Sequence, residues 1–276
     1  MTTVQIRNAV ITATILAAAA GAYWWFQRSA EHSQPTLVVA PVVASAAVTE
    51  APVAPVVAAA QHYPVVDDGA PHNALPTLDT SDQVVVAALV KLEGHKSFST
   101  LLRPASFIRN IVATVDNLPR AQVAREKLPV EPLGGHFDVV TVDGVLRLGP
   151  ANATRFRPLV DALQWIRVPA LMDLYAMYYP LFQAAYVELG YPKGYFNDRL
   201  VVALDDLLTS PRVDGPVELT QSKVLYEFAD PALASRSAGQ KIMLRMGAEN
   251  ASKVKAFLAA VRDRAVHMDR AVLKAT

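Results

Sequence analysis

The chain has 276 residues, of which 52% are hydrophobic, and its formal net charge is +1. It contains no cysteine, which excludes disulfides, thiol nucleophiles, iron–sulfur clusters, cysteine-ligated zinc and a lipoprotein anchor. The basic residues form no dense run, so a nucleic-acid partner is not expected.

The N-terminus carries an apolar run that predicts a transmembrane anchor over residues 9–28. Ala9–Phe26 is uncharged, and at about 1.5 Å per residue it spans about 27 Å, close to the thickness of a hydrocarbon core. Its last four residues, Tyr23–Phe26, are aromatic, as is typical of a membrane–water interface. A signal peptide cleaved near Ala20–Ala22 is the alternative.

The distribution of Lys and Arg predicts the topology of this anchor. After Arg7 and Arg28, the next basic residue is Lys91. Because Lys and Arg near a span resist translocation, the side that lacks them is normally the translocated one. We therefore expect a single-pass inner-membrane protein, with residues 1–8 in the cytoplasm and the C-terminal domain in the periplasm.

Residues 29–79 predict a flexible tether. Ala, Val and Pro dominate this stretch, and its prolines interrupt helices and lack the amide that a central strand requires. His62, Tyr63, Asp67, Asp68 and His72 are residue types that bind metals, but their spacing matches no known site. A solvated linker without a metal is expected.

Residues 80–276 predict one globular domain, mainly α with two short β-hairpins (α+β). Helical periodicity covers 82–92, 95–102, 105–117, 154–166, 168–189, 194–208, 231–246 and 251–273. The helix at 168–189 is apolar nearly all round, which predicts a buried position. Strand patterns flank Asp143-Gly144, a two-residue hairpin signal, and a second ribbon is expected around a turn at 220–223.

Catalytic motifs are not found in the sequence, and no cofactor is expected. Nucleophile-elbow, phosphate-loop and zinc-protease patterns are absent. Ser252 and Lys255 have S-x-x-K spacing without its companion motifs, and Asp205-Asp206 point about 100° apart on a helix, so they cannot share a proton. His136 is more typical of a turn than of a catalyst. A hydrolase of unrecognised type stays open as an alternative, which changes at His136 or Asp198 would test.

The densest group of aromatic and polar residues indicates a candidate ligand or partner surface. Tyrosines suit a pocket that stacks a ring or peptide and hydrogen-bonds it. The alternative is a core helix whose hydroxyls and arginines find partners within the domain. The candidate residues are Arg155, Arg157, Tyr175, Tyr178, Tyr179, Tyr186, Tyr195, Asn197, Asp198 and Arg199.

Four stretches carry a resemblance to a known family: FIRNIVATVDNLPR, ATRFRPLVDALQWI, ALMDLYAMYYPLFQAAYVELGYP and GYFNDRLVVALDDLL. Together they resemble the bacterial family called domain of unknown function 3014, over roughly residues 80–265. The N-terminal span and the Pro/Ala tether are also similar to that family. The resemblance implies an envelope-associated protein and supplies no catalytic residues.

Three functions are compatible with these features. The first is a non-enzymatic, membrane-tethered interaction or scaffold domain that binds another envelope protein or a cell-wall component. The second is a domain that binds or senses a small ligand or glycan through the tyrosine-rich region 175–196. The third is the unrecognised hydrolase.

Overall fold

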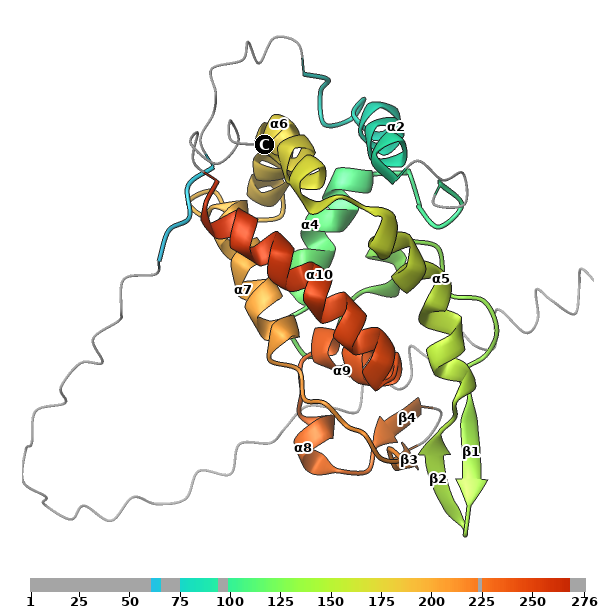
Figure 1. The fold of residues 1–276 in the computed structure, drawn as a ribbon. Helices are drawn as coiled ribbons and strands as arrows, with labels where there is room; N and C mark the ends of the chain where they lie inside the picture. Colours follow the sequence, from blue (N-terminus) through green and yellow to red (C-terminus); the bar gives the residue numbers. More distant parts are fainter. Residues whose placement is uncertain (1–60, 66–74, 94–98, 223–224, 269–276) are drawn as a thin grey trace, which may run out of the picture. The chain divides into compact units, whose positions relative to one another are not determined.

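The structure is a computed structural model that describes residues 61–65, 75–93, 99–222 and 225–268 (Figure 1). The predicted cytoplasmic residues 1–8, the predicted anchor 9–28 and most of the predicted tether lie outside these ranges. Within them, no helix combines the length and apolar character needed to cross a bilayer.

The described chain is mainly helical with two small antiparallel sheets, as the sequence predicts. Its helices are α2 (Asp82–Glu93), α4 (Phe107–Asn117), α5 (Ala151–Trp165), α6 (Val168–Glu188), α7 (Phe196–Leu208), α8 (Pro231–Ala234), α9 (Ala238–Arg245) and α10 (Ala248–Val266), with a 3-10 turn at Arg125–Lys127. Strand β1 (Val139–Val142) pairs with β2 (Val145–Leu148), and β3 (Leu219–Ser222) pairs with β4 (Leu225–Phe228).

The first hairpin forms where its turn residues predict it. Asp143 and Gly144 have φ values of 53° and 79°, the positive range required at both centres of a tight two-residue hairpin turn. Val142 therefore pairs with Val145 directly across the turn. In the second hairpin the strands run further than predicted, because Ser222 still pairs with Leu225.

Three predicted helices differ from the structure by three residues or more, among them α5, which begins at Ala151 rather than at residue 154. The stretch predicted as one helix over 231–246 forms two, α8 and α9, because Ser237 starts a new helix: its Oγ accepts a hydrogen bond from Gln240 N at 3.1 Å. Helix α10 begins at Ala248, before the predicted start, and ends at Val266. Half of the helix predicted at 95–102 lies outside the described residues, and in the other half Leu102 forms a β-bridge with Val130 instead.

The core is built around α6. One face of this helix buries Tyr178, Leu181 and Phe182 against Ile108 and Val112 of α4. Contrary to what its apolar sequence predicts, the helix is not buried on all sides, since Met177 is 61% exposed. Helices α7 and α10 run side by side next to α6 (Figure 1), and their N- and C-terminal ends, respectively, form the site described below.

Two carboxylates near the start of the domain, Asp79 and Asp82, bind α4. Asp82 of α2 accepts hydrogen bonds from the backbone N–H groups of Ser106 and Phe107, at 2.7 and 2.8 Å. It thereby caps α4, whose own N-cap residue Ser106 makes no side-chain cap. Arg109 of α4 bridges Asp79, at 2.7 Å, and Glu188, at 2.8 Å. Asp79 thus contacts the domain although the sequence assigns it to the tether.

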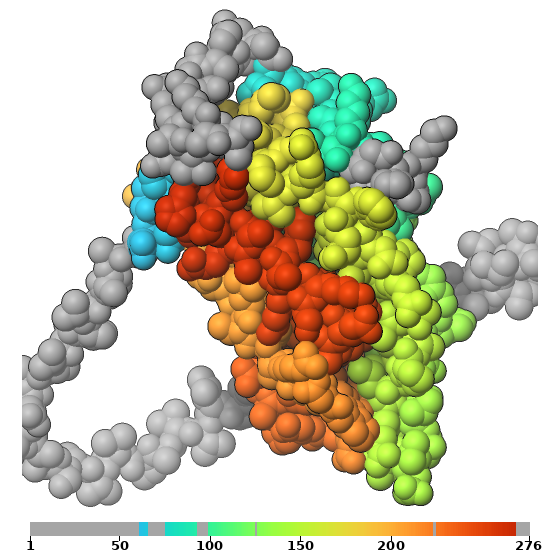
Figure 2. All heavy atoms as spheres, viewed as in Figure 1, coloured from blue at the N-terminus to red at the C-terminus, as the bar shows by residue number. Residues whose placement is uncertain are grey.

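Residues 61–65, also within the predicted tether, form a separate extended segment. Figure 2 shows this segment, in light blue, against the surface of α7 and α10. Tyr63 and Val65 pack on a cluster that includes Met172, Val201 and Ala265. The structure therefore places two parts of the predicted tether against the domain.

Candidate functional site

The N-terminus of α7 holds the main chain of Tyr63 by both of its polar groups. Asp198 Oδ1 accepts a hydrogen bond from Tyr63 N at 2.7 Å. Asn197 Nδ2 donates to Tyr63 O at 2.9 Å. Asn197 and Asp198, which are adjacent, thus bind the C=O and the N–H of one residue. We call these two side chains the backbone clamp.

Asn197 is fixed in place by the three helices that meet at it. Its side chain is fully buried, and Nδ2 also donates to Ala265 O in the last turn of α10, at 2.9 Å. Its Oδ1 accepts from the Tyr175 hydroxyl of α6 at 3.2 Å. Because every polar atom of the amide has a partner, its orientation toward Tyr63 is set before any segment binds.

The second member of the clamp also binds a side chain of the segment. His62 Nδ1 lies 2.9 Å from Asp198 Oδ2, and the two side chains are 43% and 27% exposed. The His62 ring lies on Tyr195, with 4.1 Å between ring centroids. The site therefore holds Tyr63 by its main chain, and the preceding histidine by a hydrogen bond and a ring contact.

A buried charge cluster lies on the other side of α7, where α4 ends. Asp116, with a side chain 7% exposed, accepts from Arg199 Nε at 2.9 Å and from Arg120 NH2 at 2.8 Å. The Tyr191 hydroxyl lies 3.2 Å from the same carboxylate. The hydrogen bond to Asp116 raises the pKa of Arg120. The two arginines neutralise the Asp116 carboxylate, and the contact with Arg199 joins α4 to α7.

The tyrosines predicted as a ligand surface lie mostly inside the domain. Tyr178 and Tyr186 are buried, and Tyr179 donates to Gln183 Oε1 at 3.1 Å. Burial raises the pKa of Tyr179 to about 12 and that of Tyr175 well above its usual value. Their hydroxyls therefore stay protonated at neutral pH, so these groups are not poised as bases or nucleophiles. Tyr195, by contrast, is 51% exposed beside the clamp.

The ten residues predicted as one surface lie at separate places in the structure. Tyr175, Tyr195, Asn197 and Asp198 meet at the clamp, whereas Arg199 belongs to the Asp116 cluster. The candidate arginines of α5 lie elsewhere. Arg155 donates to Gly134 O at 2.8 Å and thereby holds the loop before β1, and Arg157 is exposed on the same helix.

An apolar cavity of about 180 Å³ lies next to the clamp. It is walled by α2, α4, α6, α7 and α10, and its lining includes Val115, Leu174, Tyr175, Tyr178 and Phe196. Tyr175 thus belongs to both places: its ring faces the cavity and its hydroxyl holds Asn197. The lining suits an uncharged apolar molecule rather than a sugar, which would leave its hydroxyls without partners.

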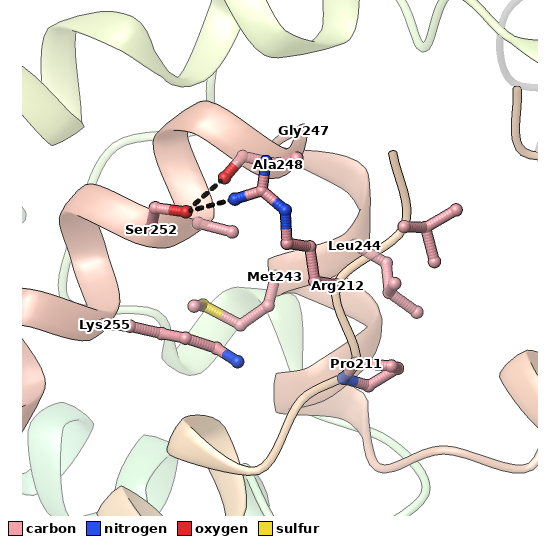
Figure 3. Close-up of a pocket in the computed structure, with 10 residues that line it drawn as sticks. Pro211, Arg212, Met243, Leu244, Gly247, Ala248, Ser252 and Lys255 are labelled. Carbon is pink, nitrogen blue, oxygen red and sulfur yellow. Dashed lines mark hydrogen bonds between the residues drawn. The ribbon is translucent and has the colours of Figure 1, made fainter. Parts of the chain in front are cut away.

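Ser252 and Lys255 do not form a catalytic pair. They border a second, smaller cavity of about 90 Å³ at the start of α10, where their side chains point to different partners (Figure 3). Ser252 Oγ donates to Ala248 O at 2.9 Å and accepts from Arg212 NH1 at 3.1 Å. Lys255 Nζ donates to Ser210 O. Neither group is available to activate the other.

The remaining acidic and histidine candidates serve the fold or lie at the surface. Asp205 pairs with Arg262, whereas Asp206 accepts from Ser237 Oγ at 2.6 Å at the start of α9. His136 is exposed in the loop before β1. Within the ranges that the structure describes, no three His, Asp or Glu residues gather as metal ligands.

Sequence reasoning missed the segment that occupies the clamp and the carboxylate that organises α4 and α7. One signal was available for the segment, because Tyr63 is the only aromatic residue between positions 29 and 79. Asp116 also had a local signal, since Arg120 follows it at i+4, just after the end of α4. Its contact with Arg199 spans 83 positions and had none.

The fold and the clamp together define a helical domain that holds an extended segment of polypeptide chain. Residues 107–262 match a family described as Protein of unknown function (DUF3014), and the chain belongs to this family, as the sequence motifs predict. No curated protein and no solved structure matches the chain. The matched range contains the clamp and the Asp116 cluster but neither α2 nor residues 61–65.

Proposed function

We propose that this protein is a membrane-tethered, non-enzymatic interaction domain of the bacterial cell envelope. Residues 9–28 anchor it in the inner membrane with residues 1–8 in the cytoplasm, and the helical domain lies in the periplasm, where it binds another envelope protein or a cell-wall component. The apolar run and the 62-residue interval without Lys or Arg between Arg28 and Lys91 support this topology.

The observation that carries the binding role is the backbone clamp. A buried asparagine and a half-buried aspartate at the start of α7 hold both main-chain groups of Tyr63. Main-chain recognition of an extended segment is a recurring way in which domains bind partner proteins. The state of the nearby ionisable groups also favours binding over catalysis, because Asp116 is neutralised by two arginines and burial keeps the tyrosines protonated.

Site-specific photocrosslinking in living cells tests this role. A photoreactive residue replaces Tyr195, 51% exposed beside the clamp, in the full-length protein, and Leu225, 64% exposed on β4, serves as the matched control. We expect a defined adduct with one envelope component at position 195 and none at position 225. Equal background labelling at both positions would contradict the proposal.

A reporter fusion tests the proposed membrane topology separately. A reporter enzyme that is active only in the periplasm, fused after Thr276, is expected to be active, and the full-length chain is expected to fractionate with the inner membrane. Activity of a cytoplasm-only reporter at the same position would refute the proposed orientation.

A second candidate function is binding of a small apolar molecule, and the cavity beside Tyr175 favours it. Its volume of about 180 Å³ is similar to that of an engineered cavity of about 150 Å³, in another protein, that binds benzene. Benzene is expected to raise the unfolding temperature of the wild-type protein but not of Val115→Phe, which fills the cavity. An equal shift in both proteins would show that the cavity is not the site.

A further inference from the structure

We infer that the clamp, Tyr195 and the adjoining end of α10 form a peptide-binding groove, which the chain's own residues 61–65 occupy in cis. The ligand class is an extended segment with an aromatic residue that follows a histidine. This inference rests on the proposed interaction function and adds its ligand and its regulation: a partner's segment binds by displacing residues 61–65.

The clamp binds the main chain of Tyr63 with one acceptor and one donor, as a neighbouring β-strand would. In an extended chain the N–H and C=O of one residue point to the same side, which is how a strand pairs with its neighbour. Asp198 and Asn197 supply an acceptor at 2.7 Å and a donor at 2.9 Å on that side of Tyr63. Since these bonds reach only main-chain atoms, they fit any segment that adopts this conformation.

The side-chain contacts add selectivity to this main-chain recognition. Tyr63 packs against the apolar cluster that includes Met172, Val201 and Ala265, which favours an aromatic side chain at the clamped position. His62 lies between Asp198, at 2.9 Å, and the ring of Tyr195. The residue after the clamped position is Pro64, which has no N–H and therefore needs no partner from the groove.

The occupant is attached in a way that permits exchange. Gln61, His62 and Pro64 are exposed, and only Tyr63 and Val65 are partly buried, so few contacts must break for the segment to leave. Positions 66–74 join it to Leu75 of the domain, and so short a connection gives an effective concentration of about a millimolar. A partner's segment competes with this concentration and binds only the fraction of molecules whose groove is open.

Direct competition in the full-length protein tests the inference. The probe is a fluorescent synthetic peptide with the sequence of residues 59–67, titrated into detergent-solubilised protein. We expect weak binding to the wild type. Binding should be at least about 10-fold tighter to a chain that carries His62→Ala and Tyr63→Ala, because those changes weaken the occupant and leave the groove intact.

Two controls separate groove binding from adhesion to the domain. The chain with His62→Ala and Tyr63→Ala is called the occupant variant, and its tighter peptide binding is called the gain. Asp198→Ala, added to the occupant variant, is expected to abolish the gain, because it removes the acceptor of the clamped N–H. A peptide methylated on its tyrosine amide nitrogen is also expected to lose the gain, since it cannot donate to Asp198. Tight binding that ignores both changes would overturn the inference, as would an occupant variant that is folded but binds no better than the wild type.

If the occupant variant does not fold, a second measurement on the wild-type protein tests the inference. Hydrogen exchange of the Tyr63 amide is followed in the wild type with and without excess unlabelled peptide. Faster exchange with peptide supports displacement, and unchanged exchange at a saturating excess contradicts it. Failure of the competition leaves the crosslinking result at Tyr195 standing, so loss of this inference and loss of the proposed function are distinguishable.

Discussion

Replacing Asn197 by alanine should destabilise the domain far more than its size suggests. The side chain is fully buried and bonds to Ala265 O, Tyr63 O and the Tyr175 hydroxyl. Ala265 lies in the last turn of α10, where carbonyls have no partner within the helix. The substitution leaves this carbonyl and the Tyr175 hydroxyl buried without partners. At about 1–3 kcal/mol for each, the expected loss is about 2–6 kcal/mol.

Urea unfolding monitored by tryptophan fluorescence measures this loss. The matched control is Asp198→Asn, the neighbouring change at the same end of α7. It keeps an oxygen to accept from Tyr63 N, and its side chain is 27% exposed, so we expect a cost below about 1 kcal/mol. A change of less than about 0.5 kcal/mol for Asn197→Ala would show that Asn197 does not join the three helices.

Three further predictions follow from the packing and the charges. Arg199→Gln should cost about 2–3 kcal/mol in urea unfolding and Arg120→Gln less than about 1 kcal/mol, because the Arg199 side chain is 21% exposed and that of Arg120 is 49% exposed beside the same carboxylate. Equal costs for the two variants would contradict this. Val115→Ile adds a methylene to the cavity and should stabilise by up to about 0.8 kcal/mol, whereas Val112→Ile on the same helix, 1% exposed and away from the cavity, should cost about 1–3 kcal/mol. Thermal unfolding measures both variants, and a lower unfolding temperature for Val115→Ile than for Val112→Ile would contradict this. Because folding raises the pKa of Tyr179 to about 12, the folded state keeps a proton that the unfolded state loses, so stability is full below about pH 10 and falls as the pH rises toward about 12. Urea midpoints measured over this range should fall less for Tyr179→Phe, and an equal fall would exclude this residue as a cause.

The sequence predicted the features that depend on local patterns. Apolar residues at helical spacing marked 105–117 and 194–208, which form α4 and α7 within two residues of the expected bounds. Asp143-Gly144 predicted the first hairpin because few other residues adopt its positive φ values. These signals lie within a few residues of the structure that they cause.

The features that escaped prediction join distant parts of the chain. Asp82 caps a helix 24 residues further on, and Asp198 binds Tyr63 across 135 positions. No periodicity encodes such contacts, because they depend on how the helices pack. The candidate surface had the same difficulty: on an apolar helix such as α6, the sequence does not distinguish Tyr178, which is buried, from Met177, which is exposed.

Hydrogen exchange at the Tyr63 amide of the full-length protein tests most directly whether the domain holds an extended segment. The bond to Asp198 predicts slow exchange at Tyr63 in the wild type and exchange at the rate of a free chain in Asp198→Ala, with Val201 in α7 equally protected in both proteins. Exchange of the wild-type Tyr63 amide at the free-chain rate would contradict the clamp and the function that rests on it.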